Sequence, residues 1–591
     1  MNPETRQCQN CKNAFVIEAQ DFEFYKKIDV SSPTWCPECR RQRRLAFRNE
    51  RSLHHRMCDL CKKDIISRYP AEVPSPVYCP DCWRSDNWDP LDYGREYDFS
   101  KPFFLQFKEL WDTVPQLALA TVNSINSNYA NHVLDSKNVY LSISTVRSEN
   151  IYYSYRTDDS RDIFDSAYSY HSEKCLEVID THASNKVGFG QYVQECLNSQ
   201  FLYDVRNSQN CLASVNLRNA KYQIFNMEYS EEEYRRILEK YDLGSYRNSI
   251  DFEKKFKEHN LRYPRRYAVL NKCQNVTGNN VENSKNSAFC FDGYDIENSK
   301  FLIMAVDGAK DCYDLTLSGI KAELCYEAIS TMGSRNRFSV GAYGQDMEYV
   351  WDCYSKTATH LFGCISIGKK KDFCILNKQY TEEEYGRMIQ KIKKHMEEMP
   401  HKDKQGRVFH YGEFFPPGIS PFGYNETLAY EYSPLSREEA EEKGFVWKEN
   451  LRKKPAVTLS FEDMPDHIRE TRDEITKEII GCIHQGQCAD RCTEGFRVLP
   501  EELTLYREFN LPLPRLCPNC RHAQRVGQRE GFQLHKRQCQ CAGKSSEEGI
   551  YENTGTHSHG EAHCPNTFQT TYAPDRPEIV YCEACYQAEV V

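Results

Sequence analysis

The sequence predicts a mainly β, multidomain protein in which two double zinc-ribbon modules flank a duplicated parallel β-solenoid with short capping helices. Three observations lead to this fold class. Cys-x-x-Cys pairs gather at both ends of the 591-residue chain, the residues between them repeat at regular twelve-residue intervals, and one helix-start motif closes each half of the repeat. We expect seven segments: a double zinc-ribbon module (1–90), a connector or cap (91–135), a first solenoid half with its capping helix (136–245), a linker (246–280), a second solenoid half with its capping helix (281–395), a helical or irregular connector (396–480) and a second double module (481–591).

The first module contains four Cys-x-x-Cys pairs at a spacing typical of zinc ligands. Four thiolates complete a tetrahedron and leave no position for water, so such sites are structural. Sequential pairing assigns four consecutive cysteines to each ion, and interleaved pairing stays open as an alternative. The predicted ligands are Cys8, Cys11, Cys36 and Cys39 for one ion and Cys58, Cys61, Cys79 and Cys82 for the other.

The last module repeats these spacings. The separation of 25 residues between Cys11 and Cys36 recurs between Cys492 and Cys517. A 22-residue insertion after Cys539, relative to the first module, contains another cysteine and three histidines (Cys541, His557, His559 and His563), which we expect not to bind metal because loop histidines usually do not. The predicted ligands are Cys488, Cys492, Cys517 and Cys520 for one ion and Cys539, Cys564, Cys582 and Cys585 for the other, which gives four Zn²⁺ per chain.

Cysteine usage also indicates a cellular compartment. The N-terminal residues lack the apolar core of a signal peptide, and no apolar run is long enough to span a membrane, so we expect a cytoplasmic protein without a membrane partner. The chain has 28 cysteines, and in a reducing cytosol the Cys-x-x-Cys pairs among them indicate metal binding rather than disulfides.

The first knuckles resemble a known family. Residues 7–44, with Cys8-x2-Cys11 and later Trp35-Cys-Pro-Glu-Cys-Arg-Arg, resemble a zinc-ribbon domain of uncharacterised bacterial proteins. Residues 488–525 resemble it with one extra residue in the first knuckle, Cys488-x3-Cys492. The stretch from Tyr411-Gly-Glu-Phe-Phe-Pro to Ser420-Pro-Phe-Gly-Tyr-Asn-Glu-Thr is similar to larger bacterial proteins that carry such domains. The resemblance implies a metal and a fold, and no activity.

A basic segment follows Cys39, and a second one follows Cys520. A knuckle that leads into a basic helix could place cations on phosphates. Equally, the arginines could form a solvated helix that balances the negative charge of a thiolate site. The formal net charge of −10 excludes a generally basic nucleic-acid binder, so any such contact must be local. The candidate contacts are Arg40, Arg41, Arg43, Arg44, Arg48, Arg521, Arg525 and Arg529.

The central repeat has a twelve-residue step, marked by Ser136, Ser148, Ser160, Ser172 and Ser184. Near Gln200 the phase loosens, because the serine lies at position 199. Equal steps with stacked columns are typical of a solenoid, and two steps would make a coil of about 24 residues, with Asn and Ser at its corners. An antiparallel meander with even strands stays an alternative. One predicted column is Tyr140, Tyr152, Phe164, Leu176, Gly188, Gln200, Leu212 and Ile224.

The second half repeats the first after 151 residues and closes with the same motif. Ser230 with Glu233, and Thr381 with Glu384, form capping boxes that predict helix starts. Counting back from Ile375 in steps of twelve gives the column Phe291, Ile303, Leu315, Glu327, Ser339, Trp351 and Gly363. Cysteines in the apolar columns (Cys175, Cys211, Cys290 and Cys374) are interpreted as small buried hydrophobes. Further helices are predicted over 102–111 and 466–480.

Three functions are compatible with this organisation. The chain lacks a Walker loop, a dinucleotide fingerprint, a nucleophile elbow and HExxH, so we expect no enzyme and no small-molecule substrate. The first function is a zinc-binding scaffold that grips RNA or DNA through the basic segments, and the alternative is a protein–protein interaction scaffold that uses the solenoid surface. The weakest is a carbohydrate-active β-helix with the acids Asp158, Asp159 and Asp162.

Overall fold

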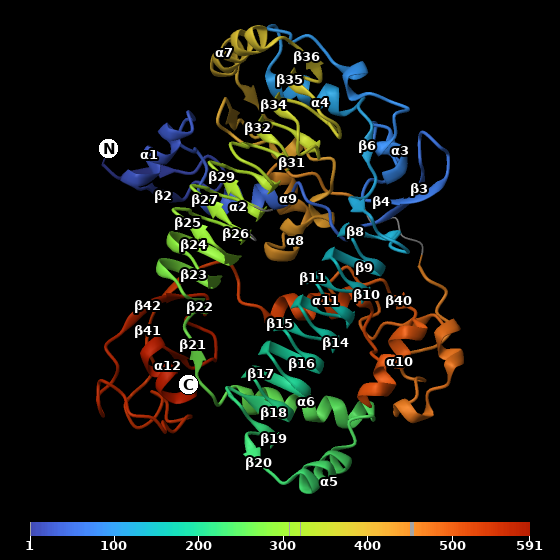
Figure 1. The fold of residues 1–591 in the computed structure, drawn as a ribbon, viewed down its shortest axis with the longest axis vertical. Helices are drawn as coiled ribbons and strands as arrows, with labels where there is room; N and C mark the ends of the chain where they lie inside the picture. Colours follow the sequence, from blue (N-terminus) through green and yellow to red (C-terminus); the bar gives the residue numbers. More distant parts are fainter. Residues whose placement is uncertain (1, 306–307, 319–320, 450–453) are drawn as a thin grey trace. The chain divides into compact units, whose positions relative to one another are not determined.

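The computed structural model describes residues 2–305, 308–318, 321–449 and 454–591, and its internal gaps fall in the predicted second solenoid half and in the connector that follows it. Within these ranges the fold is mainly β, with 43 strands and 12 α-helices (Figure 1). Among the helices described, none is both long and apolar enough to cross a membrane.

Two compact units make up the chain, and each is assembled from separate segments. Unit 1 consists of Met1–Ala120, Ala268–Glu449 and Gly531–Leu534, and unit 2 consists of Thr121–Tyr267, Asn450–Glu530 and His535–Val591. The N-terminal cysteine module therefore shares a unit with the second half of the repeat. The C-terminal module shares a unit with the first half.

Unit 2 contains a 14-stranded sheet that is parallel except at its last hairpin. Eight strands pair in the order β14, β12, β10, β9, β11, β13, β15 and β16, and β16 also pairs with β14, which closes a ring of parallel strands. The strands are β7 (Thr121–Val122), β8 (Tyr129–Leu134), β9 (Lys137–Val146), β10 (Glu149–Tyr152), β11 (Tyr155–Asp158), β12 (Arg161–Phe164), β13 (Ala167–Tyr170), β14 (Glu173–Leu176), β15 (Ile179–His182), β16 (Asn185–Gln194), β17 (Leu197–Arg206), β18 (Gln209–Val215), β19 (Lys221–Ile224) and β20 (Met227–Glu228).

The register of this sheet has the predicted twelve-residue step. Tyr140 is the Cα partner of Tyr152, Tyr152 is the partner of Phe164, and the same separation continues to Ile224. Parallel pairing excludes the antiparallel meander here. Because each step pairs directly with the next one, the expectation that two steps combine into one larger coil is wrong. Three of the steps, from β10 to β15, also hold two short strands instead of one.

A left-handed backbone conformation recurs at every third residue of this sheet. From Asp135 to Phe225 these residues have φ between 45° and 60°, a region that residues other than glycine rarely adopt. Hydrogen bonds between steps hold the conformation, as when the Tyr153 N–H donates to the Tyr140 carbonyl (3.0 Å). From Ser136 to Ser214, the residue after each such corner is buried. In one step these residues are Val139, Ser142, Thr145 and Ser148.

The repeated serines therefore line the interior, and the expectation that they occupy corners is wrong. The Ser148 hydroxyl donates to the carbonyl two residues earlier (2.7 Å) and accepts the N–H of Ser160 (3.1 Å). Cys196 takes the position that follows Ser184 in this column, so the phase is kept and Ser199 belongs to a different column. The same two bonds recur at Ser136, Ser160 and Ser172.

Unit 1 contains an 11-stranded parallel sheet and a four-stranded sheet. The 11-stranded sheet consists of β22 (Leu270–Asn271), β23 (Gln274–Glu282), β24 (Lys285–Tyr294), β25 (Ile296–Glu297), β26 (Ile303–Ala305), β27 (Ala309–Lys310), β28 (Thr316–Ser318), β29 (Ala322–Glu323), β30 (Ile329–Thr331), β31 (Val340–Ala342) and β33 (Trp351–Cys353). The smaller sheet consists of β32 (Gln345–Glu348), β34 (Thr359–Phe362), β35 (Asp372–Ile375) and β36 (Lys378–Gln379).

The steps of unit 1 differ in length. Phe291 pairs with Ile303 and Ile303 with Thr316, which are steps of twelve and thirteen, whereas Ile329 pairs with Val340, a step of eleven. Single-residue changes in step length displace a column counted in strict twelves. The predicted positions Leu315, Glu327, Ser339 and Gly363 are therefore wrong for this column, although Trp351 belongs to it.

The predicted capping helices are present. α5 (Glu231–Tyr241) starts at the Ser230 capping box, and α7 (Glu382–Glu398) starts at the Thr381 capping box. α4 (Phe103–Trp111) also matches its prediction. The helix predicted over 466–480 is wrong, because the backbone there bonds to the segment before α6 (Tyr246–Asn260) and forms only the 3-10 turns η4 (Ile468–Glu470) and η5 (Asp473–Lys477).

Candidate metal centres

Cluster 1 consists of Cys8, Cys11, Cys36 and Cys39, whose sulfur atoms all lie within 4.8 Å of one another. The first two lie in the turn between β1 (Glu4–Gln7) and β2 (Ala14–Ile17), and the last two begin α2 (Pro37–Leu45). The Cys36 N–H donates to the sulfur of Cys8 (3.3 Å), and the Cys39 N–H donates to that of Cys36 (3.5 Å). The structure thus groups these cysteines sequentially.

Cluster 2 (Cys58, Cys61, Cys79 and Cys82) repeats this arrangement. Its first pair lies in the turn between β3 (His54–Met57) and β4 (Asp64–Ser67), and its second pair begins α3 (Pro80–Arg84). The Cys79 N–H donates to the sulfur of Cys58 (3.3 Å). Although burial acts in the opposite direction, this N–H and that of Cys61 lower the pKa of Cys58 to about 7, which favours the thiolate that binds metal.

Cluster 3 differs from the prediction in one residue: it contains Cys482, Cys492, Cys517 and Cys520. Cys482 is the structural equivalent of Cys8, because it follows a strand of a two-stranded hairpin, β39 (Ile480–Gly481) with β40 (Gly495–Phe496), and its sulfur accepts the Cys517 N–H at 3.3 Å. Cys488 lies beside the cluster, with its sulfur 3.7 Å from that of Cys520. The prediction of Cys488 followed the shorter knuckle spacing, whereas the chain inserts residues between Cys482 and Cys492.

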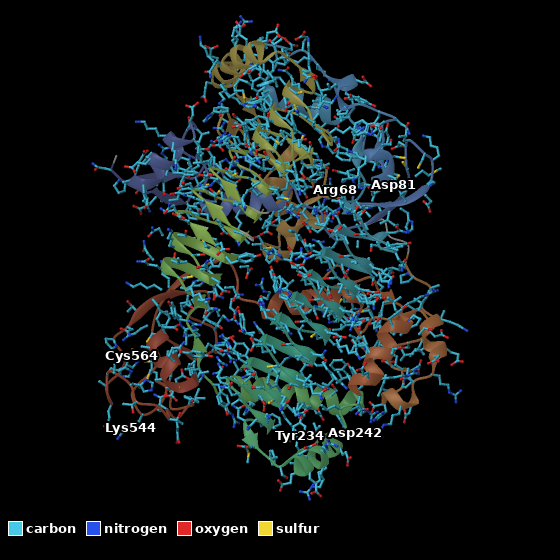
Figure 2. The ribbon with its side chains drawn as sticks, in the orientation of Figure 1. Arg68, Asp81, Tyr234, Asp242, Lys544 and Cys564 are labelled. Atoms are coloured by element: carbon cyan, nitrogen blue, oxygen red, sulfur yellow. The ribbon has the colours of Figure 1, made fainter. Side chains whose placement is uncertain are left out.

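Cluster 4 contains the predicted residues Cys539, Cys564, Cys582 and Cys585. They follow β41 (His535–Gln538), precede β42 (Thr567–Thr570), and lie at the end of β43 (Val580–Tyr581) and in α12 (Glu583–Val590). Cys564 is labelled in the C-terminal segment of Figure 2. The Cys582 N–H donates to the sulfur of Cys539 (3.2 Å), as in the other clusters.

Each cluster offers four sulfur atoms and N–H groups that stabilise the thiolate form, which suits a soft, four-coordinate ion in a closed structural site. The donor set therefore fits a metal. It leaves no open coordination position of the kind that a catalytic zinc uses to bind water.

The basic helix that follows cluster 1 is buried against the sheet of unit 1. Arg43 and Arg44 are both 0% exposed, and Arg40 is 1% exposed. Arg40 pairs with Asp314 (2.7 Å), Arg43 pairs with Glu327 (2.7 Å), and Arg44 also contacts Asp314 (3.2 Å). Burial raises the pKa of Glu327 to about 7, and the guanidinium of Arg43 opposes this shift.

Unit 2 contains the same network. Arg521 and Arg525 lie in α11 (Pro518–Gln528) and share Asp165, at 2.9 and 3.0 Å. Arg525 also pairs with Glu177 (2.7 Å). Arg521 pairs with Glu502 of α10 (Pro500–Phe509) at 3.0 Å. Burial raises the pKa values of both glutamates to about 7, and the arginines oppose these shifts.

The remaining candidate arginines are also engaged inside their units. Arg41 is buried and pairs with Glu38, and Arg48 is buried and pairs with Glu50. Arg529 has a side chain that is 10% exposed and pairs with Asp180 (3.5 Å). These arginines therefore do not present solvent-exposed cations, since their buried charges are held by internal carboxylates, and nucleic-acid binding stays a prediction. Neither sequence interpretation, the phosphate-contacting helix or the solvated helix, predicted that these arginines are buried.

No known protein family, curated protein or solved structure matches this chain. The resemblance to zinc-ribbon domains therefore stays a prediction, and the site rests on its geometry.

Sequence reasoning missed two sets of residues. Cys482 is absent from the predicted ligands, although Ile479 and Ile480 before it favour a strand that leads into the cysteine turn. The buried acids Asp165 and Asp314 carry no local motif, and their signal is weak, since each simply follows an aromatic residue of its repeat.

In contrast, the interior cysteines behave as predicted. Burial raises the pKa of each thiol to about 12, so these residues stay protonated and pack as small hydrophobes. They are Cys175, Cys211, Cys290 and Cys374.

Proposed function

We propose that the protein is a zinc-dependent, non-enzymatic binding scaffold whose partner is another protein. Clusters 1 to 4 would each hold one Zn²⁺ in a module of zinc-ribbon type, giving four ions per chain. Zinc would supply folding energy to the short hairpins, because such segments bury little apolar surface of their own. Cysteines grouped in metal-binding sets fit a reducing cytosol as the compartment.

The central sheets serve as the rigid part of this scaffold, and we assign them to a β-solenoid whose coil is a single twelve-residue step in unit 2. The support is the register, in which every parallel pair from Lys137 to Ile224 joins equivalent positions of successive steps. Four left-handed corners in each step turn the chain back onto the preceding step. A stack of repeats presents extended outer surfaces, which repeat proteins use for binding.

The observation that supports a protein partner over a nucleic acid is the burial of the arginines. A phosphate backbone requires cations that reach solvent. The eight candidates are instead paired with carboxylates within each unit, and the net charge of the chain is −10. A protein partner therefore fits the remaining surface better than a nucleic acid.

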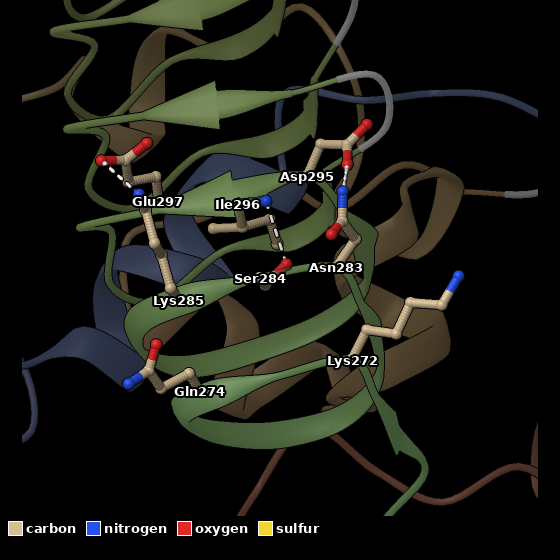
Figure 3. Close-up of a pocket in the computed structure, with 8 residues that line it drawn as sticks. All are labelled: Lys272, Gln274, Asn283, Ser284, Lys285, Asp295, Ile296 and Glu297. Atoms are coloured by element: carbon tan, nitrogen blue, oxygen red, sulfur yellow. Dashed lines mark hydrogen bonds and ion pairs between the residues drawn. The ribbon is translucent and has the colours of Figure 1, made fainter.

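A surface pocket of the same kind occurs in both repeats and is the proposed contact. In unit 1, Lys285 pairs with Glu297 (3.3 Å), the Asn283 amide bonds Asp295, and Ser284 accepts the Ile296 N–H (2.9 Å), as Figure 3 shows. The unit 2 pocket has an analogous set: Lys137 with Glu149 (2.8 Å), Asn123 with Asp135 (3.1 Å) and Ser136 with the Ser148 N–H (3.1 Å). The rows of alternating charge suit an extended segment of mixed charge.

Site-specific crosslinking tests this proposal. A photoreactive residue at Lys137 or Lys285 in the full chain should crosslink to a protein in cell extract treated with nuclease. The same residue at the exposed positions Lys240 and Lys394, outside the pockets, should not. Crosslinks to RNA or DNA, or equal yields at all four positions, would contradict a protein contact at the pockets.

Nucleic-acid binding gives an independent measurement. We expect mixed RNA and DNA to bind the zinc-loaded chain weakly, with little change between low and physiological salt, because the candidate arginines are held by carboxylates and cannot displace counterions. Tight binding whose affinity falls steeply with rising salt would make nucleic acid the favoured partner.

A further inference from the structure

The insertion in the last module assembles a second group of metal-binding side chains beside cluster 4. Cys541, His557, His559 and Cys585 place one ligand atom each within 4.8 Å of one another. Three of the four are buried, and Cys585 also belongs to cluster 4. The first module lacks the inserted residues that supply the other three ligands.

The two histidines are oriented as metal ligands are. His557 bonds through Nε2 to Glu589 (2.8 Å), whose side chain is fully buried, and its own side chain is 2% exposed. Its Nδ1 is buried, and among the described residues it has no hydrogen-bond partner. A buried ring nitrogen without a partner is costly. A carboxylate on the opposite nitrogen is the usual second partner of a histidine that binds metal.

His559 shows the complementary arrangement. Its Nδ1 lies 2.7 Å from the Ala562 carbonyl, which fixes Nδ1 as the donor and leaves Nε2 with a free lone pair. That Nε2 lies 3.3 Å from the sulfur of Cys585. The rings of His557 and His559 stack with centroids 5.2 Å apart, and one nitrogen of each ring lies within 4.8 Å of the sulfur atoms of Cys541 and Cys585.

Helix α12 and the insertion hold the remaining ligands in place. Cys585 and Glu589 lie one turn apart on α12, so one helix supplies both a ligand and the carboxylate that orients His557. Glu589 also accepts the N–H groups of Thr554 (2.8 Å) and Gly555 (3.0 Å). The sulfur of Cys541 is fully buried and accepts the amide of Asn553 (3.2 Å).

We propose that cluster 4 and this group form a two-zinc centre in which the Cys585 thiolate bridges both ions. Two tetrahedral ions that share one ligand need seven donors, and the site provides five cysteines and two histidines. The chain would then hold five Zn²⁺ instead of four. This inference rests on the proposal that the four cysteine clusters bind zinc, and it extends that proposal to three residues outside the clusters.

Metal content and magnetism test the inference on the full chain. We expect five zinc ions per chain in the unmodified protein and four in His559→Ala and in Cys541→Ser. His563→Ala is the matched control, since this histidine lies in the same insertion and is not in the group, and it should keep five. A content of four in the unmodified protein overturns the two-zinc centre while leaving the four clusters intact, whereas a content near zero also removes the proposed function.

Cobalt substitution separates a lost site from a misfolded module. In the fully Co(II)-loaded protein, a shared thiolate should couple the spins of two ions, and magnetic susceptibility should detect that coupling. The coupling should vanish in His559→Ala and persist in His563→Ala. Five ions without any coupled pair would overturn the bridge.

Discussion

The two units keep the same arginine network on sheets of different regularity. In unit 2 every step from Lys137 to Ile224 has the same twelve-residue length, whereas in unit 1 the steps vary from eleven to fourteen. Nevertheless Arg40 and Arg44 share Asp314 as Arg521 and Arg525 share Asp165. The comparison shows that the length of a step can vary from eleven to fourteen residues while the buried arginines keep their carboxylate partners.

Of the changes proposed here, metal removal should reduce the stability of both units the most. We expect a strong chelator to unfold both units, because structural zinc sites contribute about 10–16 kcal/mol of apparent binding free energy in small modules. Circular dichroism and thermal unfolding would measure the loss of folded structure. If the units are equivalent, Cys39→Ser should reduce hydrogen-exchange protection at α2 and Cys520→Ser at α11. Full protection of α2 in the absence of zinc would contradict a structural role for cluster 1.

Separate substitutions of Cys482 and Cys488 test whether clusters 1 and 3 are equivalent. We expect Cys482→Ser to lose one zinc ion per chain, because its sulfur occupies the position of Cys8. Cys488→Ser should retain that ion and unfold at nearly the same temperature. Elemental analysis of both variants, purified in parallel, gives the result. The reverse outcome would restore Cys488 as the ligand.

Removal of a shared carboxylate should destabilise either unit to a similar extent. We expect Asp314→Asn and Asp165→Asn each to cost about 3–5 kcal/mol, since each leaves two buried guanidinium groups without their full charge partner. Glu149→Gln is the control, because its pair with Lys137 is exposed and should contribute about 0–1 kcal/mol. Denaturant unfolding measures all three. A cost confined to one unit would show that the networks are not equivalent.

The interior serine column should give the smallest effect. Ser160→Ala removes both the acceptor for the Ser172 N–H and a donor, at a cost of about 1–3 kcal/mol. Ser299→Ala in unit 1 tests the same position, since Ser299 accepts the Cys312 N–H at 3.0 Å. Ser160→Cys should cost less, because Cys196 occupies this column naturally. Equal losses for the Ala and Cys variants would argue against a hydrogen-bonding role.

Local pattern was sufficient for much of the fold. Cysteine spacing located three of the four clusters, because cysteines that meet from a hairpin turn and a helix start must lie a few residues apart within each pair. The register of unit 2 followed from equal spacing of Tyr140, Tyr152 and Phe164, and the capping boxes at Ser230 and Thr381 followed from short local motifs. Counting in strict steps of twelve failed to predict the column of unit 1, since the sequence has no marker for a step that gains or loses a residue.

Features that depend on distant partners could not be read in this way. The left-handed corners occur at residues as different as Asn138, Tyr153 and Lys174, so the residue type does not predict the conformation. Arginines beside a cysteine knuckle look the same whether they face solvent or a carboxylate from a remote part of the chain, as Arg40 faces Asp314.

The sequence alone therefore determined where most of the cysteines cluster and how often the sheet of unit 2 repeats, because both are set by short spacings along the chain. Only the tertiary structure decided that Arg40 and Arg521 lie inside, that Cys482 replaces Cys488, and that Cys541, His557 and His559 meet at Cys585. Each of these depends on which groups are buried together. Burial is a property of the folded chain, and short-range spacing does not predict it.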